Sequence, residues 1–253
     1  MIIAILCGSP YSTYARDILR EMNARGIKGV HIIAAAPARA QGGHSSLLSF
    51  PLAVVRGTVR GLRRVIRGGA AVSNGSGELE SVVASQGGRL IMVADVNGGE
   101  CQQVLRELEV DLMVLGGAPI MKAPVLSVPK IGTLNAHQGA LPRYRGMNVI
   151  EWALLEKRPP TVTVHFVDPG VDTGDIVRVE RIPVLPGDTL KSVRERSNAL
   201  QSRLLADAVL AAVNGPLPRH AQAKEDGVQF YAMHPTLKLV AERHLQGFLH
   251  GAM

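Results

Sequence analysis

Two polar side chains lie two positions apart near the middle of the sequence, Asn135 and His137, within the stretch LNAHQGALPRYRG. Residues at this spacing project from the same face of a β-strand. The residues KIGTLNAH are typical of a strand that becomes polar at its C-terminal end. In open α/β sheets, ligands bind outside the C-terminal ends of the strands. We therefore expect Asn135 and His137 to point together into a binding site.

A carboxylate partner is available in the later stretch DPGVDTGDI, which carries Asp168, Asp172 and Asp175. A buried carboxylate beside His137 would fix the imidazole tautomer and favour its protonated form. An amide and an imidazolium are hydrogen-bond donors suited to an oxyanion that develops in a transition state. Neither a Ser or Cys nucleophile nor a second His at metal-ligand spacing accompanies them, so the nucleophile should come from the substrate. The pattern predicts metal-free acyl transfer to an amine through a tetrahedral intermediate.

The elements that must position these side chains alternate between strands and helices. We expect strands at 2–7, 30–36, 89–96, 111–117, 131–137, 161–168 and 175–184. Helices should follow at 13–26, 78–88, 99–110, 148–157, 188–215 and 235–251. This order predicts an α/β, Rossmann-like fold with a mostly parallel twisted sheet and helices on both faces. The last two strands are close enough in sequence to be antiparallel neighbours, and the alternation in TVTVHFVD indicates one buried and one exposed face.

An irregular stretch at about residues 37–77 interrupts this order and contains PLAVVRGTVRGLRRVIRGG. In a helix, its Leu, Val and Ile residues form one stripe that the Arg side chains flank. We predict a basic helical insertion. It either covers the sheet with solvated charges or contacts an anionic acceptor, a carrier or a membrane surface.

The composition limits the classes of function. The chain of 253 residues has 46% hydrophobic and 4% aromatic residues, a net charge of +7 and a pI of about 9.8. A basic balance favours acidic partners, whereas few aromatics argue against stacked nucleic-acid bases. The two cysteines lack metal or disulfide-framework spacing, and GSP lacks a P-loop or dinucleotide fingerprint. The apolar runs are too short for a signal peptide or a transmembrane span, so we expect a soluble cytoplasmic protein.

LNAHQGALPRYRG followed by TVTVHFVDPGVDTGDI resembles the formyltransferase family, which includes glycinamide ribonucleotide, methionyl-tRNA and sugar N-formyltransferases. The resemblance implies N10-formyltetrahydrofolate as co-substrate and a catalytic trio at Asn135, His137 and Asp172. It also implies that the folate contacts the loop in GGAPIMKAP and the turn before Asp172. The residues concerned are Ala118, Pro119, Ile120, Met121, Asp168, Pro169, Gly170 and Val171. Many members have Ser two residues after the His, where this chain has Gly139.

The resemblance covers about residues 1–214, apart from the irregular stretch. We expect a formyltransferase catalytic domain at 1–215, with the basic insertion at about 37–77, and a C-terminal appendage at 216–253. The 38 residues after Gly215 (253 minus 215) are too few for the additional five-stranded barrel of the tRNA enzyme.

The acceptor should be a small, anionic amine, such as an amino sugar or a natural-product amine. No stable nucleic-acid binding is expected, and a homodimer is left open. The alternatives are methionyl-tRNA formylation and hydrolysis of formyltetrahydrofolate.

Overall fold

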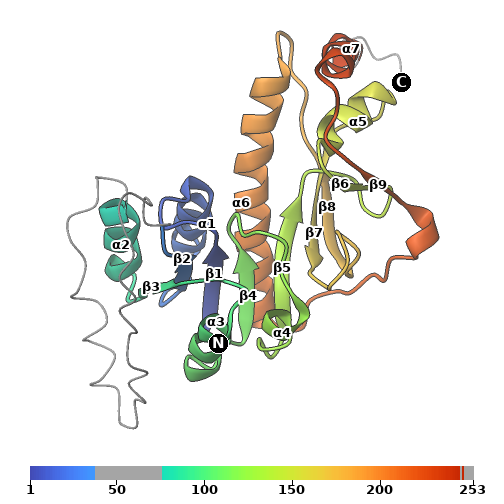
Figure 1. Cartoon of the computed structure of the whole chain (residues 1–253). Coiled ribbons are helices and arrows are strands. Elements are labelled where there is room, and N and C mark those ends of the chain that lie inside the picture. The colour runs from blue at the N-terminus through green and yellow to red at the C-terminus, as the bar shows by residue number, and fades with distance from the viewer. Residues whose placement is uncertain (38–75, 246, 248–253) are drawn as a thin grey trace, which may run out of the picture.

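The computed structural model describes residues 1–37, 76–245 and 247, and its centre is a seven-stranded sheet in the order β3-β2-β1-β4-β5-β7-β8 (Figure 1). The first five strands in this order pair in parallel, whereas β7 pairs antiparallel with both β5 and β8. This arrangement confirms the Rossmann-like, mostly parallel sheet and the antiparallel last pair. The strands are β1 (Ile3–Cys7), β2 (His31–Ala35), β3 (Leu90–Val93), β4 (Leu112–Leu115), β5 (Gly132–His137), β7 (Thr161–Phe166) and β8 (Ile176–Arg181).

Helices cover both faces of this sheet, as the alternation of elements predicts. On β1, Ile3 and Ile5 pack in one apolar cluster with residues of α1 and α6, whereas Ala4 and Leu6 pack in another with residues of α3. The alternating burial of strand side chains therefore produces two separate cores. The helices are α1 (Thr13–Ala24), α2 (Ser76–Ser85), α3 (Gly99–Glu107), α4 (Ala123–Leu126), α5 (Val149–Leu155), α6 (Leu190–Asn214) and α7 (Pro235–Leu245).

The long helix α6 begins with a side-chain cap. Thr189 accepts a hydrogen bond from the Ser192 backbone amide, and the Ser192 side chain accepts one from the Thr189 amide, which forms a capping box. Asp188 instead binds Arg196 at 2.7 Å and the Leu185 amide at 2.7 Å. These contacts, the Arg196 guanidinium first, hold the pKa of Asp188 well below its usual value. The start of α6 is thereby fastened to the loop after β8.

The alternating strand β7 differs from its sequence expectation, because all six of its residues are buried. Val162, Val164 and Phe166 pack in the same apolar cluster as α6. On the other face, the hydroxyl of Thr163 donates to Gly139 O at 2.6 Å and accepts from the Leu141 amide at 3.2 Å. The chain that follows β5 therefore covers the polar face. The prediction of one exposed face from the alternating polar residues was wrong, because backbone groups form hydrogen bonds with the buried polar side chains.

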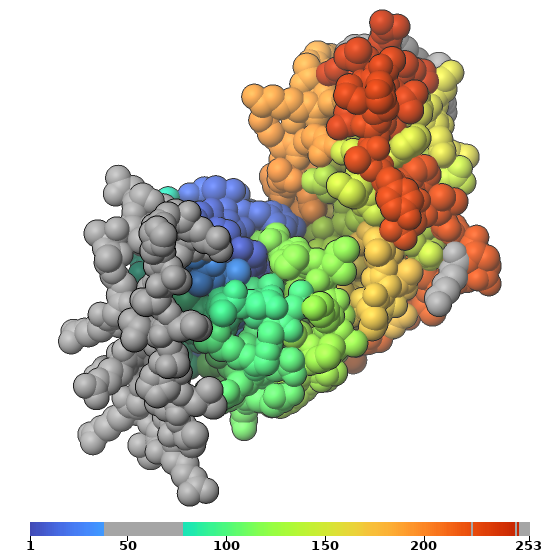
Figure 2. All heavy atoms as spheres, viewed as in Figure 1, coloured from blue at the N-terminus to red at the C-terminus, as the bar shows by residue number. Residues whose placement is uncertain are grey.

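The segment after α6 runs back along the β8 side of the sheet and ends in α7 beside α5 (Figure 1). On the way, β9 (Val228–Phe230) pairs in parallel with β6 (Tyr144–Gly146) and forms a second, two-stranded sheet. In the space-filling view, this C-terminal segment lies at the surface over the yellow-green part of the chain (Figure 2). Neither β6 nor β9 is evident from the sequence, since each has only three residues.

The predicted basic insertion at about 37–77 lies almost entirely outside the described residues, because only Pro37, Ser76 and Gly77 are described. Its helical structure and its role stay predictions.

Within the described ranges, none of the helices combines the length and the apolar character that crossing a bilayer requires.

Candidate active site

Asn135 and His137 occupy the C-terminal half of β5, where the polar period-two pattern predicts them. His137 is the last residue of the strand and is 7% exposed, and Asn135 is half-buried. The antiparallel register places Asn135 opposite His165 and His137 opposite Thr163 on β7. Side chains of directly opposite residues share one face of the sheet. The same face therefore carries Asn135, His137 and His165.

Asp172 lies in the loop between β7 and β8 and completes this group. Its φ of 53° is in the left-handed region, which Asp tolerates better than most residues. Its Oδ2 atom is 3.4 Å from His137 Nδ1 and accepts a hydrogen bond from the Gly146 amide at 2.9 Å. Its Oδ1 atom is 3.6 Å from His165 Nε2. The three residues of the predicted trio are thus adjacent in the structure.

Both ring nitrogens of His137 face hydrogen-bond acceptors. Nε2 lies 2.7 Å from Tyr144 O, and Nδ1 faces the carboxylate of Asp172. Carbonyl and carboxylate oxygens only accept, and an imidazole donates from both nitrogens only when it is protonated. The surroundings of His137 therefore offer an acceptor to either ring nitrogen that carries a proton, as a hydrogen-bond donor in the site requires. In the described structure its Nε2 proton is directed at Tyr144 O.

His165, on β7, lies beside the trio although the sequence expectations above do not include it. Its Nδ1 atom donates to Phe166 O at 2.7 Å, and Asn135 Nδ2 lies 3.3 Å from its Nε2. The side chain is 2% exposed, and burial lowers the pKa of His165 to about 4 despite the opposing effect of Asp172. A neutral His165 with its proton on Nδ1 offers Nε2 as an acceptor to Asn135. The sequence feature that could have identified His165 is its place in a strand with alternating polar residues, like the strand that carries Asn135 and His137.

The predicted folate loop, 118–121, follows β4 and is held from outside by Asn97. Asn97 Nδ2 donates to Ile120 O at 3.0 Å, and its Oδ1 accepts from the Lys122 amide at 2.8 Å. Met121 is buried, whereas the Ile120 side chain is 77% exposed. Ala118 and Met121 belong to the same apolar cluster as Val167, which precedes the second predicted folate segment. The loop 118–121 and the residue that precedes the second segment therefore meet at one apolar cluster.

The second segment, 168–171, is stabilised by its own first residue. Asp168 Oδ1 accepts hydrogen bonds from the Gly170 amide at 3.0 Å and from Thr173 Oγ1 at 2.5 Å. Pro169 and Gly170 are exposed, and Val171 is half-buried. A Cβ atom at position 170 would meet Thr173 Oγ1 at 2.0 Å. Asp168 Oδ1 thus holds the turn of this segment in place.

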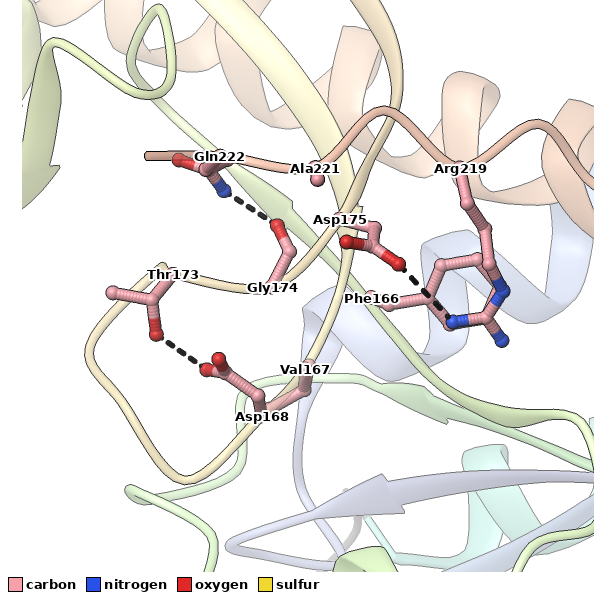
Figure 3. Close-up of a pocket in the computed structure, with 9 residues that line it drawn as sticks. All are labelled: Phe166, Val167, Asp168, Thr173, Gly174, Asp175, Arg219, Ala221 and Gln222. Carbon is pink, nitrogen blue, oxygen red and sulfur yellow. Dashed lines mark hydrogen bonds and ion pairs between the residues drawn. The ribbon is translucent and has the colours of Figure 1, made fainter. Parts of the chain in front are cut away.

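A cavity of about 340 Å³ lies beside this loop (Figure 3). Residues 166–168, residues 173–175 and three residues of the C-terminal segment, Arg219, Ala221 and Gln222, line it. The Arg219 guanidinium carbon stands 3.4 Å from the centre of the Phe166 ring, and Arg219 pairs with Asp175 at 3.6 Å. The trio does not line this cavity. The cavity lies instead where the C-terminal segment meets the loop that carries Asp172.

Comparisons with known proteins relate the chain to one family. Residues 84–209 match the sequence model of the formyl transferase family, and this range includes Asn135, His137, His165 and Asp172. The chain is 36% identical over 138 residues to the methionyl-tRNA formyltransferase of Syntrophus aciditrophicus, which covers 54% of this chain and 43% of that protein. The same enzyme of Methylacidiphilum infernorum is 35% identical over 130 residues, or 51% and 41% of the two chains. The chain thus spans less than half the length of these relatives.

Solved structures show the same fold at low sequence identity. Glycinamide ribonucleotide transformylase 1 from Symbiobacterium toebii superposes with a TM-score of 0.57 at 20% identity, over 87% of this chain and 94% of that one. An N-formyltransferase from Helicobacter canadensis, in complex with folinic acid and dTDP-3-aminofucose, gives a TM-score of 0.57 at 15% identity, over 97% and 80%. These two structures support the fold assignment.

Proposed function

The chain belongs to the formyl transferase family, to which residues 84–209 match, and we propose that it moves a formyl group from N10-formyltetrahydrofolate to a primary amine. The observation that carries this proposal is the convergence of Asn135, His137 and Asp172 at the end of β5, with Asp172 Oδ2 3.4 Å from His137 Nδ1. This group supplies hydrogen-bond donors and a carboxylate. It lacks a nucleophile of its own, which a substrate amine provides.

The roles of the three residues follow from their contacts. The bound folate supplies a formyl group, whose oxygen gains negative charge when an amine attacks the carbon. Asn135 Nδ2 has two hydrogens, and with one directed at His165 the other serves this oxygen. His137 donates its Nε2 proton to the same oxygen once that oxygen replaces Tyr144 O as the acceptor. Asp172 stabilises the charge on His137 and organises proton transfer from the amine towards the departing nitrogen.

The folate site is the space between residues 118–121 and residues 168–171. Its fit is supported by the exposed apolar side chain of Ile120, the shared apolar cluster of Met121 and Val167, and the backbone groups of both segments. A flat, polar-edged ring system needs apolar contacts on its faces and a few fixed donors and acceptors at its edge. Asp168 is engaged with Gly170 and Thr173, so it shapes the turn without contacting the ring.

For the acceptor we favour a small anionic amine, with an amino sugar nucleotide or a natural-product amine as the main candidates. The net charge of +7 supports an acidic substrate. The Helicobacter canadensis structure contains a dTDP-linked amino sugar together with folinic acid. The Arg-rich segment predicted from the sequence adds to the positive charge of the chain. We assign the catalytic unit to residues 1–215 and expect it to act in the cytoplasm.

Methionyl-tRNA is the second candidate acceptor, because the relatives at 36% and 35% identity are methionyl-tRNA formyltransferases. Positive charge is compatible with a nucleic-acid acceptor as well. Hydrolysis of the formyl folate is a further alternative, since water could take the place of the amine at the same trio. The three functions differ in which molecule gains the formyl group.

The deciding experiment incubates the protein with N10-formyltetrahydrofolate and each acceptor in turn, and then follows the products by mass. Our proposal expects one formyl group on a small amine, with tetrahydrofolate formed in equal amount. Formyl-methionyl-tRNA as the preferred product would move the assignment to the tRNA acceptor. Formate release that does not depend on an amine would identify a hydrolase. The Asp172→Asn variant serves as a matched control for background transfer.

A further inference from the structure

The segment from Arg219 to Met233, here called the C-terminal strap, lies between α6 and α7 in the chain (Figure 1) and hydrogen-bonds to the loop that carries Asp172. It contacts two separate pieces of chain. One is the β7–β8 loop, which carries Asp172, and the other is β6, which follows the strand of Asn135 and His137. The first piece carries one member of the trio, and the second hydrogen-bonds to two members, His137 and Asp172.

The contact with the β7–β8 loop is made by Gln222. Its Nε2 atom donates to Gly174 O at 2.5 Å and to Asp172 O at 3.3 Å (Figure 3 shows the first of these). Just before it, His220 exchanges two backbone hydrogen bonds with Ile176, of 2.8 and 2.9 Å. The loop is therefore held on both sides of Asp175. The backbone of Asp172 itself is one of the anchored groups.

The contact with β6 is a strand pairing. Tyr144 is in register with Val228, and Gly146 with Phe230. Gly146 has a φ of +91°, and a Cβ atom there would meet Phe230 O at 2.2 Å, so this close approach needs glycine. Tyr144 O and the Gly146 amide are the groups that bind His137 and Asp172. The strap thus stabilises the strand that provides the backbone partners of the trio.

We propose that the strap completes the active site and that Gln222 is its positioning residue for Asp172. Asp172 has a left-handed backbone conformation, which costs free energy and needs fixed surroundings to persist. Gln222 supplies one such constraint from outside the loop, and the Gly146 amide supplies another from inside. Together they hold the Asp172 carboxylate between His137 and His165. The expected loss of turnover rests on the proposed function, whereas the expected displacement of Asp172 does not.

The test replaces Gln222 by Met, which has a similar length and no N–H donor. The matched control is Gln229→Met on the same strap, where the side chain is exposed. With Gln222→Met, kcat should fall by about 10- to 100-fold, since a displacement of about 1 Å at a reacting group has effects of this size. KM for folate and for amine should stay within about twofold, and Gln229→Met should match the wild type. A second variant, Gln222→Lys, keeps N–H donors and should recover most of kcat.

A readout without substrate separates this inference from the proposed function. The ring ¹⁵N signals of His137 and His165 report their protonation and contacts, and both should shift in Gln222→Met but not in Gln229→Met. If the wild type transfers no formyl group and these shifts occur, the positioning role stands and the proposed function fails. If Gln222→Met leaves kcat and both histidines unchanged, or raises KM alone, the positioning role is refuted. If Gln222→Met does not fold, Gln222→Lys decides: unchanged histidine signals and kcat support the inference, and altered ones refute it.

Discussion

Asn135 and His165 face each other across β5 and β7, with Asn135 Nδ2 3.3 Å from His165 Nε2. Because His165 donates from Nδ1 to Phe166 O, its Nε2 is left as the acceptor, and the orientation of the Asn135 amide is thereby fixed. The opposite orientation of the amide would present its oxygen, an acceptor, to a developing oxyanion. The pairing therefore ensures that Asn135 presents a donor.

Removing the acceptor of this pair should weaken catalysis without blocking folate binding. We expect His165→Leu to lower kcat by up to about tenfold, which corresponds to the loss of one ordinary hydrogen bond. KM for the folate should change little, since His165 does not line the proposed folate loops. Steady-state kinetics with the wild type and with His31→Leu, a substitution on the distant strand β2, provide the comparison. Equal kcat values for His165→Leu and the wild type would remove His165 from the site.

The buried His165 also makes a pH-dependent contribution to stability. Its pKa is lowered to about 4 in the folded protein, whereas a histidine in an unfolded chain titrates near 6.5. Between these values the unfolded chain binds more protons, so the free energy of unfolding should decrease as the pH falls from about 6.5 towards 4. Above about pH 6.5 this contribution is fully present. Denaturant unfolding over this range measures it, and His165→Gln should show a shallower pH dependence than the wild type. Parallel curves would show that His165 titrates normally.

Gly139 leaves room for the contact between His137 and Tyr144. A Cβ atom at position 139 would lie 2.9 Å from His137 Nε2 and 2.8 Å from Tyr144 O. Gly139→Ala should therefore displace the imidazole and lower both kcat and the midpoint of thermal unfolding. Gly99→Ala is the control, because a Cβ atom there has no neighbour within 4 Å among the described residues. Unaltered histidine NMR signals in Gly139→Ala would contradict the tight packing.

Much of the fold follows from local sequence patterns, and the site follows from them in part. Apolar runs such as Ile3–Cys7 depend on neighbouring residues, so the sequence predicts the strands that they form. The period-two pair Asn135 and His137 is equally local. The role of Gln222 is different, because its partners Asp172 and Gly174 are about fifty positions away and no periodicity links them. The burial of β7 could not be predicted for the same reason, since the chain after β5 provides the cover.

The trio itself is open to a graded test. Asn135→Ala removes a donor to the formyl oxygen, and a lost donor of this kind typically lowers the rate by about 10²–10³-fold. His137→Ala and Asp172→Ala should have effects at least as large, because each removes one side of the contact between His137 and Asp172 on which the proposed mechanism depends. Circular dichroism and thermal unfolding establish that each variant keeps the fold. Variants that retain the fold and still lose turnover would separate a catalytic from a structural role.

The most direct measurement of the central claim is the single-turnover rate of formyl transfer by the wild type and by Asn135→Ala, His137→Ala and Asp172→Ala, with saturating N10-formyltetrahydrofolate and the best amine. Our account predicts that the wild type forms the formylated amine and tetrahydrofolate in equal amounts. It predicts that each substitution lowers the rate by about 10²-fold or more, with folate affinity nearly unchanged. Near-wild-type rates in all three variants, or no formylated amine from the wild type, would contradict it.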